Sequence, residues 1–363
     1  MPPILLVTGA NSGVGLATAR LAASRGVFVI ALCRSPEKGA AAVASINSTA
    51  RNGGGAELVL CDLADWSSVL DAAAKISKRT QVINAVVLNA GIAKIGESFE
   101  GPTVDKQGID IVMSFLFGHT LLVRALHPVL CNTAANGRCR VIWTSSIDHW
   151  TCSSTLDKNK TLEQCRGEMN GKLSYRTCKL GHVQVAFALN RRYGLRLHPF
   201  RGNGRVEHLA YTPGLVQSNF VERSGINTPE NRWLVALVQK CIAVKPVESA
   251  ELVLQTIMSN IDGGSFVYPY TTCDGLKCWD ELPHGKRGLY KFRFEMLQRV
   301  TGYGFRNARA SPEAYDEKEQ DALLAEIERF FTKWASEKGV ALPPAPRGWN
   351  NFDGDCRTWE WDD

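Results

Sequence analysis

Residues 4–24 read ILLVTGANSGVGLATARLAAS, and this stretch decides the fold. It starts with the apolar run Ile4–Val7, which is typical of a strand buried on both faces of a parallel sheet. A glycine turn, Thr8–Gly15, follows at once, and a helical pattern occupies Leu16–Ser24. The glycines, spaced Gly-x-x-x-Gly-x-Gly, therefore stand where backbone must approach a pyrophosphate at a helix N-terminus. Because a strand precedes the turn and a helix follows it, we predict dinucleotide binding by Gly9, Asn11, Ser12, Gly13, Val14 and Gly15.

The alternation of strand and helix continues along the chain. Further strands are predicted at Val27–Leu32, Glu57–Cys61, Ala85–Leu88, Arg140–Thr144 and Val206–Tyr211, and the longest helices at Thr103–Leu130 and Leu173–Leu195. Such units in succession predict a doubly wound parallel α/β sheet of Rossmann type. With 363 residues, 45% of them hydrophobic, the chain can bury one large core. We expect one domain at residues 1–270, with substrate-side insertions at 147–174 and 219–246 and a C-terminal extension at 271–363.

Composition excludes several classes of function. The net charge of +6 is spread along the chain without a dense Lys/Arg run among aromatic residues, so nucleic-acid binding is not expected. The eleven cysteines form no Cys-x-x-Cys pair, and Cys273 and Cys278 have no Cys or His cluster beside them, which argues against a metal site. The start shows no basic leader with a cleavage site, and no apolar run reaches the roughly 20 residues that span a bilayer. We expect reduced thiols and a cytoplasmic location.

Residues at the ends of the predicted strands indicate which cofactor binds. Arg34 follows the second strand, where an NAD-binding protein usually places an acidic residue for the ribose hydroxyls. A guanidinium there favours the 2′-phosphate of NADP, with help from Lys38, although a solvated surface Arg is the alternative. Ser35-Pro36 predicts the start of the next helix, and Asp65 is a candidate cap for the one after. Further predicted contacts are Asp62 and Leu63 near the adenine, and Asn89, Ala90 and Gly91, whose small residues let the chain pass close to the cofactor.

Tyr175 and Lys179 carry the predicted chemistry. Four residues apart on a helix, they share one face. A fixed cation beside a phenol favours the phenolate and so makes the phenol a better proton donor near neutral pH. Tyr-x-x-x-Lys alone is weak support, because a half-buried Tyr beside a solvated Lys gives the same spacing.

Five motifs in register together resemble the short-chain dehydrogenase/reductase family. They are the glycine turn at Thr8–Gly15, Asn89–Gly91, Ser146, Tyr175 with Lys179, and Pro213-Gly214. A looser likeness, carried by Val141–Ser146, Ser218-Asn219 and Tyr303-Gly304, points to the 3-ketosteroid reductases of sterol biosynthesis. The resemblance implies NADP(H) as cofactor and a homodimer paired through Thr103–Leu130 and Leu173–Leu195.

The resemblance also implies roles for individual residues. Tyr175 would protonate a carbonyl oxygen, Lys179 would lower the pKa of Tyr175 and hydrogen-bond the nicotinamide ribose, and Ser146, with Ser145 as rival, would donate a hydrogen bond to the same oxygen. Pro213, Gly214 and Ser218 would belong to a loop over the nicotinamide. The family usually has Asn where this chain has Phe115, and its main chain helps to hold a water in the proton relay. Either the Phe115 carbonyl keeps that role, or Ser114 takes it. His149 and His182 are assigned no catalytic role.

The two insertions are predicted to lie on the substrate side of the domain, and the C-terminal tail follows them. Residues 147–174 begin beside Ser146 and end beside Tyr175, which favours a functional loop. The apolar run Trp233–Val238 predicts a helix over an apolar substrate; packing on the body and peripheral docking on a membrane such as the endoplasmic reticulum are alternatives. Glu317–Trp334 predicts an amphipathic helix that packs back as a lid or edge cover, and residues 343–346 begin an extended tail.

The leading functional hypothesis is an NADPH-dependent reductase of the ketone in a large apolar molecule, such as a sterol or terpenoid. A second hypothesis keeps the fold but assigns a reductase or alcohol dehydrogenase that tailors terpenoids or polyketides in secondary metabolism, since a fold does not identify a substrate. A third is an NADP-binding sensor with weakened catalysis, for which Phe115 is the support.

Overall fold

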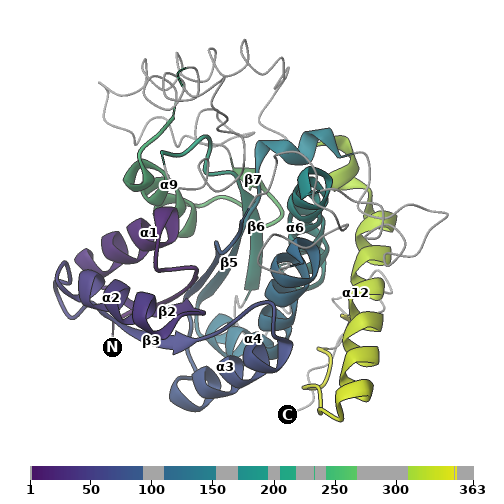
Figure 1. The fold of residues 1–363 in the computed structure, drawn as a ribbon, viewed down its shortest axis with the longest axis horizontal. Helices are drawn as coiled ribbons and strands as arrows, with labels where there is room; N and C mark the ends of the chain where they lie inside the picture. Colours follow the sequence, from purple (N-terminus) through teal and green to yellow (C-terminus); the bar gives the residue numbers. More distant parts are fainter. Residues whose placement is uncertain are drawn as a thin grey trace.

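The computed structural model describes residues 2–92, 110–152, 171–194, 205–217, 233, 243–267, 310–346 and 348–349. Their centre is a parallel sheet with the strand order β3-β2-β1-β4-β5-β6-β7 (Figure 1). The strands are β1 (Ile4–Thr8), β2 (Phe28–Cys33), β3 (Gly55–Leu60), β4 (Ala85–Leu88), β5 (Arg138–Thr144), β6 (Arg205–Tyr211) and β7 (Phe266–Val267). The strand order reverses between β1 and β4, which confirms the predicted doubly wound fold and places its ligand crevice at their carboxyl ends.

Helices cover both faces of the sheet because strand residues alternate between two cores. Leu5 and Val7 face one core, whereas Leu6 faces the other. The first core is closed by α1 (Gly13–Ser24), α2 (Pro36–Asn47) and α9 (Pro246–Met258). The second is closed by α3 (Trp66–Arg79), α4 (Gly118–Ala135) and α6 (Gly171–Tyr193). As predicted, Ser35 caps α2 by accepting from the Lys38 amide, and Asp65 caps α3 by accepting from the Ser67 amide.

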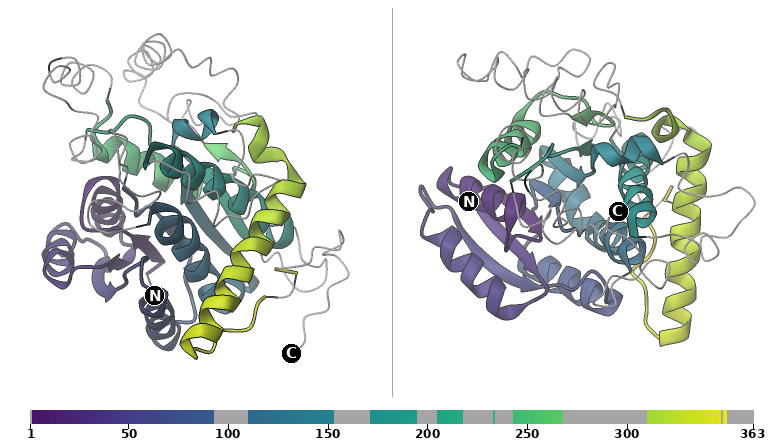
Figure 2. Two further views of the ribbon diagram at one scale, coloured as in Figure 1. Left: turned by 45° about the vertical axis from the view of Figure 1, so that its right-hand side comes forward. Right: turned by 45° about the horizontal axis from the view of Figure 1, so that its top comes forward.

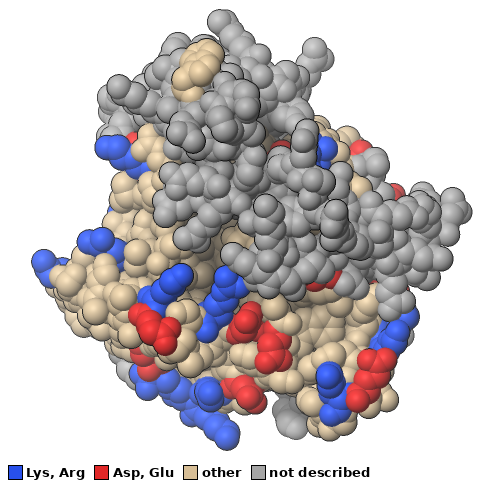
Figure 3. Space-filling model, in the orientation of Figure 1, with Lys and Arg blue, Asp and Glu red and all other residues tan. Residues whose placement is uncertain are grey.

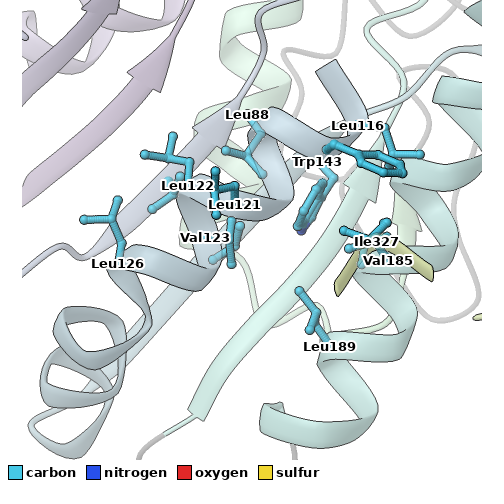
Figure 4. Packing of buried hydrophobic residues seen from close by; sticks show 14 of the residues in the cluster. Leu88, Leu116, Leu121, Leu122, Val123, Leu126, Trp143, Val185, Leu189 and Ile327 are labelled. Atoms are coloured by element: carbon cyan, nitrogen blue, oxygen red, sulfur yellow. The ribbon is translucent and has the colours of Figure 1, made fainter. Parts of the chain in front are cut away.

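The second core holds the larger side chains. Figure 4 shows Trp143 of β5 beside Leu116, with Val185 and Leu189 of α6 close by. Each fully buried Val or Leu side chain contributes about 1.5–3 kcal/mol relative to exposure, so this layer holds α4 and α6 firmly on the sheet. The predicted site residues Tyr175 and Lys179, which α6 carries, are therefore built on a rigid element.

The long helix predicted at Thr103–Leu130 differs from the structure in two ways. A π-helical turn, Val112–Phe117, precedes α4, and α4 ends at Ala135 rather than Leu130. The helix runs past Leu130 because neither glycine nor proline interrupts residues 131–136, and it ends just before Gly137. Residues 103–109 lie outside the described part of the chain. Val112–Ala135 is long and apolar enough to cross a membrane, yet it is mostly buried, as in the core helix of a globular protein.

The amphipathic helix predicted near the C-terminus is α12 (Glu317–Lys338). It begins at Asp316, whose carboxylate accepts from the Lys318 and Glu319 amides, and ends at Gly339 with φ +64°. The predicted apolar stripe is confirmed, because the five side chains Leu323, Leu324, Ile327, Phe330 and Phe331 are buried. They belong to the same core cluster as the sheet, so this part of the C-terminal extension is not a separate unit.

Helix α12 lies along the outer side of α6 in every view (Figures 1 and 2). Ion pairs hold it there: Arg124 of α4 pairs with Glu328 at 2.8 Å, and Arg192 of α6 pairs with Asp321 at 2.8 Å. The tail continues across the same face, since Arg124 donates to the Pro343 carbonyl and Trp349 is fully buried. The homodimer expected through Thr103–Leu130 and Leu173–Leu195 would use a face along which α12 lies. The homodimer and its interface stay predictions.

On the face that Figure 3 presents, Lys and Arg side chains are interspersed with Asp and Glu side chains. Of the helix predicted at Trp233–Val238, only Trp233 is described, and its side chain is 69% exposed.

Candidate active site

The glycine turn has the backbone geometry that its sequence predicts. Gly9 and Gly13 have φ of +66° and +55°, in the left-handed region that favours glycine. A Cβ on Gly15 would lie 2.4 Å from the Gly9 carbonyl oxygen and 2.5 Å from Asn89 Nδ2. Only glycine therefore lets the first turn of α1 approach the ends of β1 and β4. Ser12 precedes α1 without a side-chain capping bond, which leaves the first-turn N–H groups to an anion.

Thr8 ties the two central strand ends together. Its Oγ1 accepts from the amides of Asn89 at 2.9 Å and Ala90 at 3.0 Å. Because both lone pairs are used, the hydroxyl proton is donated to Nε2 of His119, 2.9 Å away. Asn89 Nδ2 also donates to the Thr8 carbonyl at 3.2 Å. The predicted contacts Asn89, Ala90 and Gly91 are thereby held beside the glycine turn.

Arg34 and Asp62, which are predicted to contact the 2′-phosphate and the adenine, lie at the ends of β2 and β3. Arg34 follows Cys33 and is exposed, and it has no ion-pair partner among the described residues. Glu37, in the first turn of α2, accepts from the Ser35 hydroxyl at 2.9 Å, and this hydrogen bond and one from a backbone amide lower the pKa of Glu37. The amide of Asp62 donates to Ser68 Oγ and its carboxylate accepts from Ala64, so this turn is fixed.

The loop after β6 shows the last predicted cofactor contacts only in part. Gly214 has φ +76°, which only glycine adopts readily, and the Pro213 carbonyl accepts from Ser249 Oγ at 2.8 Å. Helix α9 thus anchors the start of this loop. Ser218 lies outside the described residues.

Tyr175 and Lys179 point from α6 toward the ends of β4 and β5. Both side chains are buried, and Lys179 Nζ lies 5.6 Å from the centroid of the Tyr175 ring. Lys179 Nζ donates to the Thr144 carbonyl at 2.8 Å. A Cβ on Gly91 would lie 3.6 Å from the same Nζ. The ammonium therefore stands between the predicted catalytic tyrosine and the predicted cofactor loop.

The two serines after β5 have different partners. Ser145 is buried, and its hydroxyl donates to the Lys179 carbonyl at 2.7 Å, so it fixes α6 to the sheet. Ser146 is only half-buried and hydrogen-bonds Tyr175. Of the two serines, Ser146 is the one placed to hydrogen-bond the same substrate oxygen atom as Tyr175.

The electrostatics of Tyr175 differ from the expectation. Burial raises the pKa of Tyr175 strongly, the Asp148 carboxylate raises it further, and the Ser146 hydrogen bond lowers it less. Burial also lowers the pKa of Lys179. Burial therefore outweighs the expected lowering of the Tyr175 pKa by Lys179, because desolvation penalises the phenolate. The phenol keeps its proton at neutral pH, which is the form that a proton donor needs.

Asp148 belongs to the site although sequence reasoning missed it. Its Oδ2 lies 3.2 Å from Ser146 Oγ, and its amide donates to the same Oγ at 3.2 Å. Burial raises the pKa of Asp148, which the Ser146 hydrogen bond and the cations Arg176 and Lys172 partly offset. The signal in the sequence was an acid two residues after the candidate serine.

His182, which was assigned no role, lies under the site one turn beyond Lys179. Its Nε2 is 3.0 Å from the Phe115 carbonyl and its Nδ1 is 2.9 Å from the Thr144 carbonyl. Burial lowers the pKa of His182 to about 3, so the neutral ring carries one proton. The Phe115 carbonyl, expected to hold a water, thus faces a side chain of the protein. At the position where the family usually has Asn, the carbonyl of Phe115 is thus contacted by His182 of α6. The Lys-x-x-His spacing of Lys179 and His182 was the signal in the sequence for this contact.

The predicted cofactor residues fit a nicotinamide dinucleotide as a set. The glycine turn, the first turn of α1, Arg34 and Gly91 follow one another along the carboxyl ends of β2, β1 and β4. Within the described ranges no three His, Cys, Asp or Glu side chains gather as metal ligands would. The polar side chains that the structure brings together here are the hydroxyls of Ser146 and Tyr175, the Lys179 ammonium and the Asp148 carboxyl group.

Comparison with known proteins points the same way. Residues 3–150 match the family model of short chain dehydrogenases. The chain is 31% identical over 192 residues to a short-chain dehydrogenase/reductase, prx1, of Penicillium roqueforti, covering 53% of either chain. It is 27% identical over 224 residues to the 3-keto-steroid reductase/17-beta-hydroxysteroid dehydrogenase 7 of Homo sapiens, covering 53% of this chain and 62% of that protein. The chain spans less than two thirds of either relative.

Solved structures agree in fold. Levodione reductase aligns with a TM-score of 0.57 at 21% identity, over 73% of this chain and 95% of that one. An alcohol dehydrogenase from Thermococcus sibiricus, complexed with 5-hydroxy-NADP, aligns with a TM-score of 0.53 at 17% identity, over 74% of this chain and 96% of that one. At these identities the likeness shows the arrangement of the sheet and helices.

Proposed function

We propose that the chain is a member of the short-chain dehydrogenase/reductase family, which its matches support, and that it is an NADPH-dependent reductase of ketones in large apolar molecules. One observation carries the proposal: Ser146 hydrogen-bonds Tyr175, and Lys179 of the same helix lies beside Tyr175 and Gly91. A hydroxyl donor, a protonated phenol and an ammonium next to a dinucleotide loop are what ketone reduction requires.

Each residue has a defined task in this reaction. The glycine turn Thr8–Gly15 and Gly91 would hold a nicotinamide cofactor, which would supply the hydride for the carbonyl carbon. Tyr175 gives its phenolic proton to the carbonyl oxygen, and Ser146 turns its hydroxyl from Asp148 to that oxygen as negative charge develops there. Lys179 donates one of its three N–H groups to the Thr144 carbonyl, so its other N–H groups can donate to the nicotinamide ribose.

The substrate class is argued from the relatives. One relative is named a 3-keto-steroid reductase, which supports a ketone on a large apolar skeleton. The alternative is a tailoring reductase of secondary metabolism, since the Penicillium relative is named only a short-chain dehydrogenase/reductase and its name gives no substrate. NADPH oxidation with a panel of ketosteroids, terpenoid ketones and polyketide ketones separates the two. A cofactor-binding protein that oxidises NADPH with none of them would be a sensor.

Replacing Arg34 with Ala is expected to weaken NADPH binding by roughly 10–100-fold and to leave NADH binding nearly unchanged. A charge-assisted hydrogen bond to a phosphate contributes about 1.5–3 kcal/mol, and NADH has no 2′-phosphate. Fluorescence titration of both cofactors measures the ratio. Arg51→Ala is the control, because Arg51 is exposed and, among the described residues, its side chain donates to the carbonyl of Ala50 alone. Equal affinity of the wild type for both cofactors would refute the NADP assignment.

A further inference from the structure

His149 hydrogen-bonds both the backbone of Ser146 and residues 310–315, which are called the C-terminal segment below. It lies in the 3-10 turn Ile147–Thr151, which starts at Ser146, and its side chain is fully buried. Nδ1 lies 2.5 Å from the Ser146 carbonyl oxygen, and Nε2 lies 3.1 Å from the Ser311 amide nitrogen. Ser146 and Ser311 are 165 positions apart in the sequence, so this ring is a direct contact between the site and the C-terminal segment.

The partners determine the tautomer of the ring. A backbone amide can only donate, so Nε2 must accept from Ser311 and carry no proton. Burial lowers the pKa of His149 to about 4, which leaves the ring neutral near pH 7. Its one proton therefore sits on Nδ1 and is donated to the Ser146 carbonyl. Both ring nitrogens are satisfied, and neither can be exchanged for the other.

The Ser311 end of this contact is itself firmly held. Ser311 and Ala314 are fully buried, and the amide of Ala314 donates to the Ser311 carbonyl. Gln320, in the first turns of α12, donates to the Ala314 carbonyl at 2.8 Å. The His149 ring also packs on Phe266 of β7, with ring centroids 4.9 Å apart. The ring is thus fixed from α12 on one side and from the sheet on the other.

We propose that His149 is a positioning residue through which the segment at residues 310–315 holds Ser146 in its catalytic place. The Ser146 backbone carries the hydroxyl that faces Tyr175, and the Nδ1 proton fixes that backbone. The proposal rests on the proposed function for its catalytic consequence, but the link itself does not depend on any substrate. It makes the C-terminal segment part of the active site.

The test compares two variants of Ser311. Ser311 has φ −58° and ψ 153°, which proline adopts without strain, so Ser311→Pro removes the N–H donor and puts a ring carbon against His149 Nε2, which breaks the contact. Ser311→Ala keeps that N–H. It removes a buried hydroxyl that has no hydrogen-bond partner within the described structure. The comparison therefore reports the loss of the Ser311 to His149 contact as a whole.

We expect Ser311→Pro to lower kcat about tenfold, because a small misplacement of a catalytic group is costly, while the KM for NADPH stays the same. Hydrogen exchange should quicken at the amides of His149 and Cys152, which close this turn. Ser311→Ala should match the wild type in both measurements. Should Ser311→Pro lose its cooperative melt, His149→Asn takes its place: its amide can still donate to Ser146 but no longer reaches Ser311, and the same two changes are expected.

The proposal is overturned if Ser311→Pro has both the hydrogen-exchange rates and the kcat of the wild type. It is also overturned if the amides of Ser311→Pro exchange faster while its kcat equals that of the wild type. If the wild type reduces no ketone, the proposed function fails, and the exchange comparison alone decides whether the link exists. Slower exchange in the wild type and Ser311→Ala than in Ser311→Pro supports the link in that case. Equal exchange in all three refutes it.

Discussion

Tyr175→Phe is expected to lower kcat by about 10²–10⁴-fold while NADPH still binds. The substitution removes only the phenolic oxygen from a buried ring, so packing on α6 is retained. That oxygen is the group that Ser146 hydrogen-bonds and whose proton burial holds in place at neutral pH. Binding and turnover should therefore separate. Steady-state kinetics on a good ketone, with a cofactor titration, measures both.

Tyr193→Phe is the matched control. Tyr193 lies on the same helix, is fully buried and packs against His127 and Trp349 instead of the site. Its kcat should stay near that of the wild type. If Tyr175→Phe also kept near-normal turnover, α6 would be scaffold only. The acid would then be sought at Asp148, the carboxyl group beside Ser146 whose pKa burial raises.

Glu328→Ala is expected to lower the free energy of unfolding by about 3–5 kcal/mol. Arg124 is only 3% exposed, and Glu328 accepts from its Nε at 3.0 Å and its Nη2 at 2.8 Å. Without the carboxylate a buried guanidinium loses its counter-charge and retains the Pro343 carbonyl. The loss of stability should affect α12 and the tail that follows it together. Urea denaturation followed by circular dichroism measures it.

Glu326→Ala provides the comparison on the same helix. Glu326 pairs with Arg329 at 2.8 Å, but that guanidinium is 47% exposed. An exposed pair of this kind contributes about 0.2–1 kcal/mol, so the control should change little. Equal small losses in both variants would show that the buried ion pair contributes little to holding α12 on the domain.

The sheet could be predicted from the sequence because its signals are local. The run Ile4–Val7, the glycine turn after it and the similar runs in later units each report on a few neighbouring residues. Strand β4 was predicted with its observed bounds, and the strands from β1 to β6 differ from their predictions by at most two residues at either end. The caps Ser35 and Asp65 followed for the same reason, since a capping bond spans only two or three residues.

The contacts around the site could not be predicted in this way, because their partners are far apart in the sequence. His149 meets Ser311, and His182 meets Phe115, through the packing of whole helices. The pKa of Tyr175 follows from burial, a property of the assembled core, whereas the Tyr-x-x-x-Lys spacing indicated only the neighbouring charge. The stripe on α12 was visible in the sequence, but its target, the face of α4 and α6, was not.

The most direct test of the central claim follows the hydride itself. NADPH carrying deuterium at both positions of nicotinamide C4 is incubated with the wild type and a ketosteroid or terpenoid ketone, and the product is analysed by mass spectrometry. The proposed function predicts an alcohol with one deuterium on the former carbonyl carbon, formed much more slowly by Tyr175→Phe at saturating NADPH. Tight NADPH binding without deuterium transfer to any ketone of the panel would contradict it.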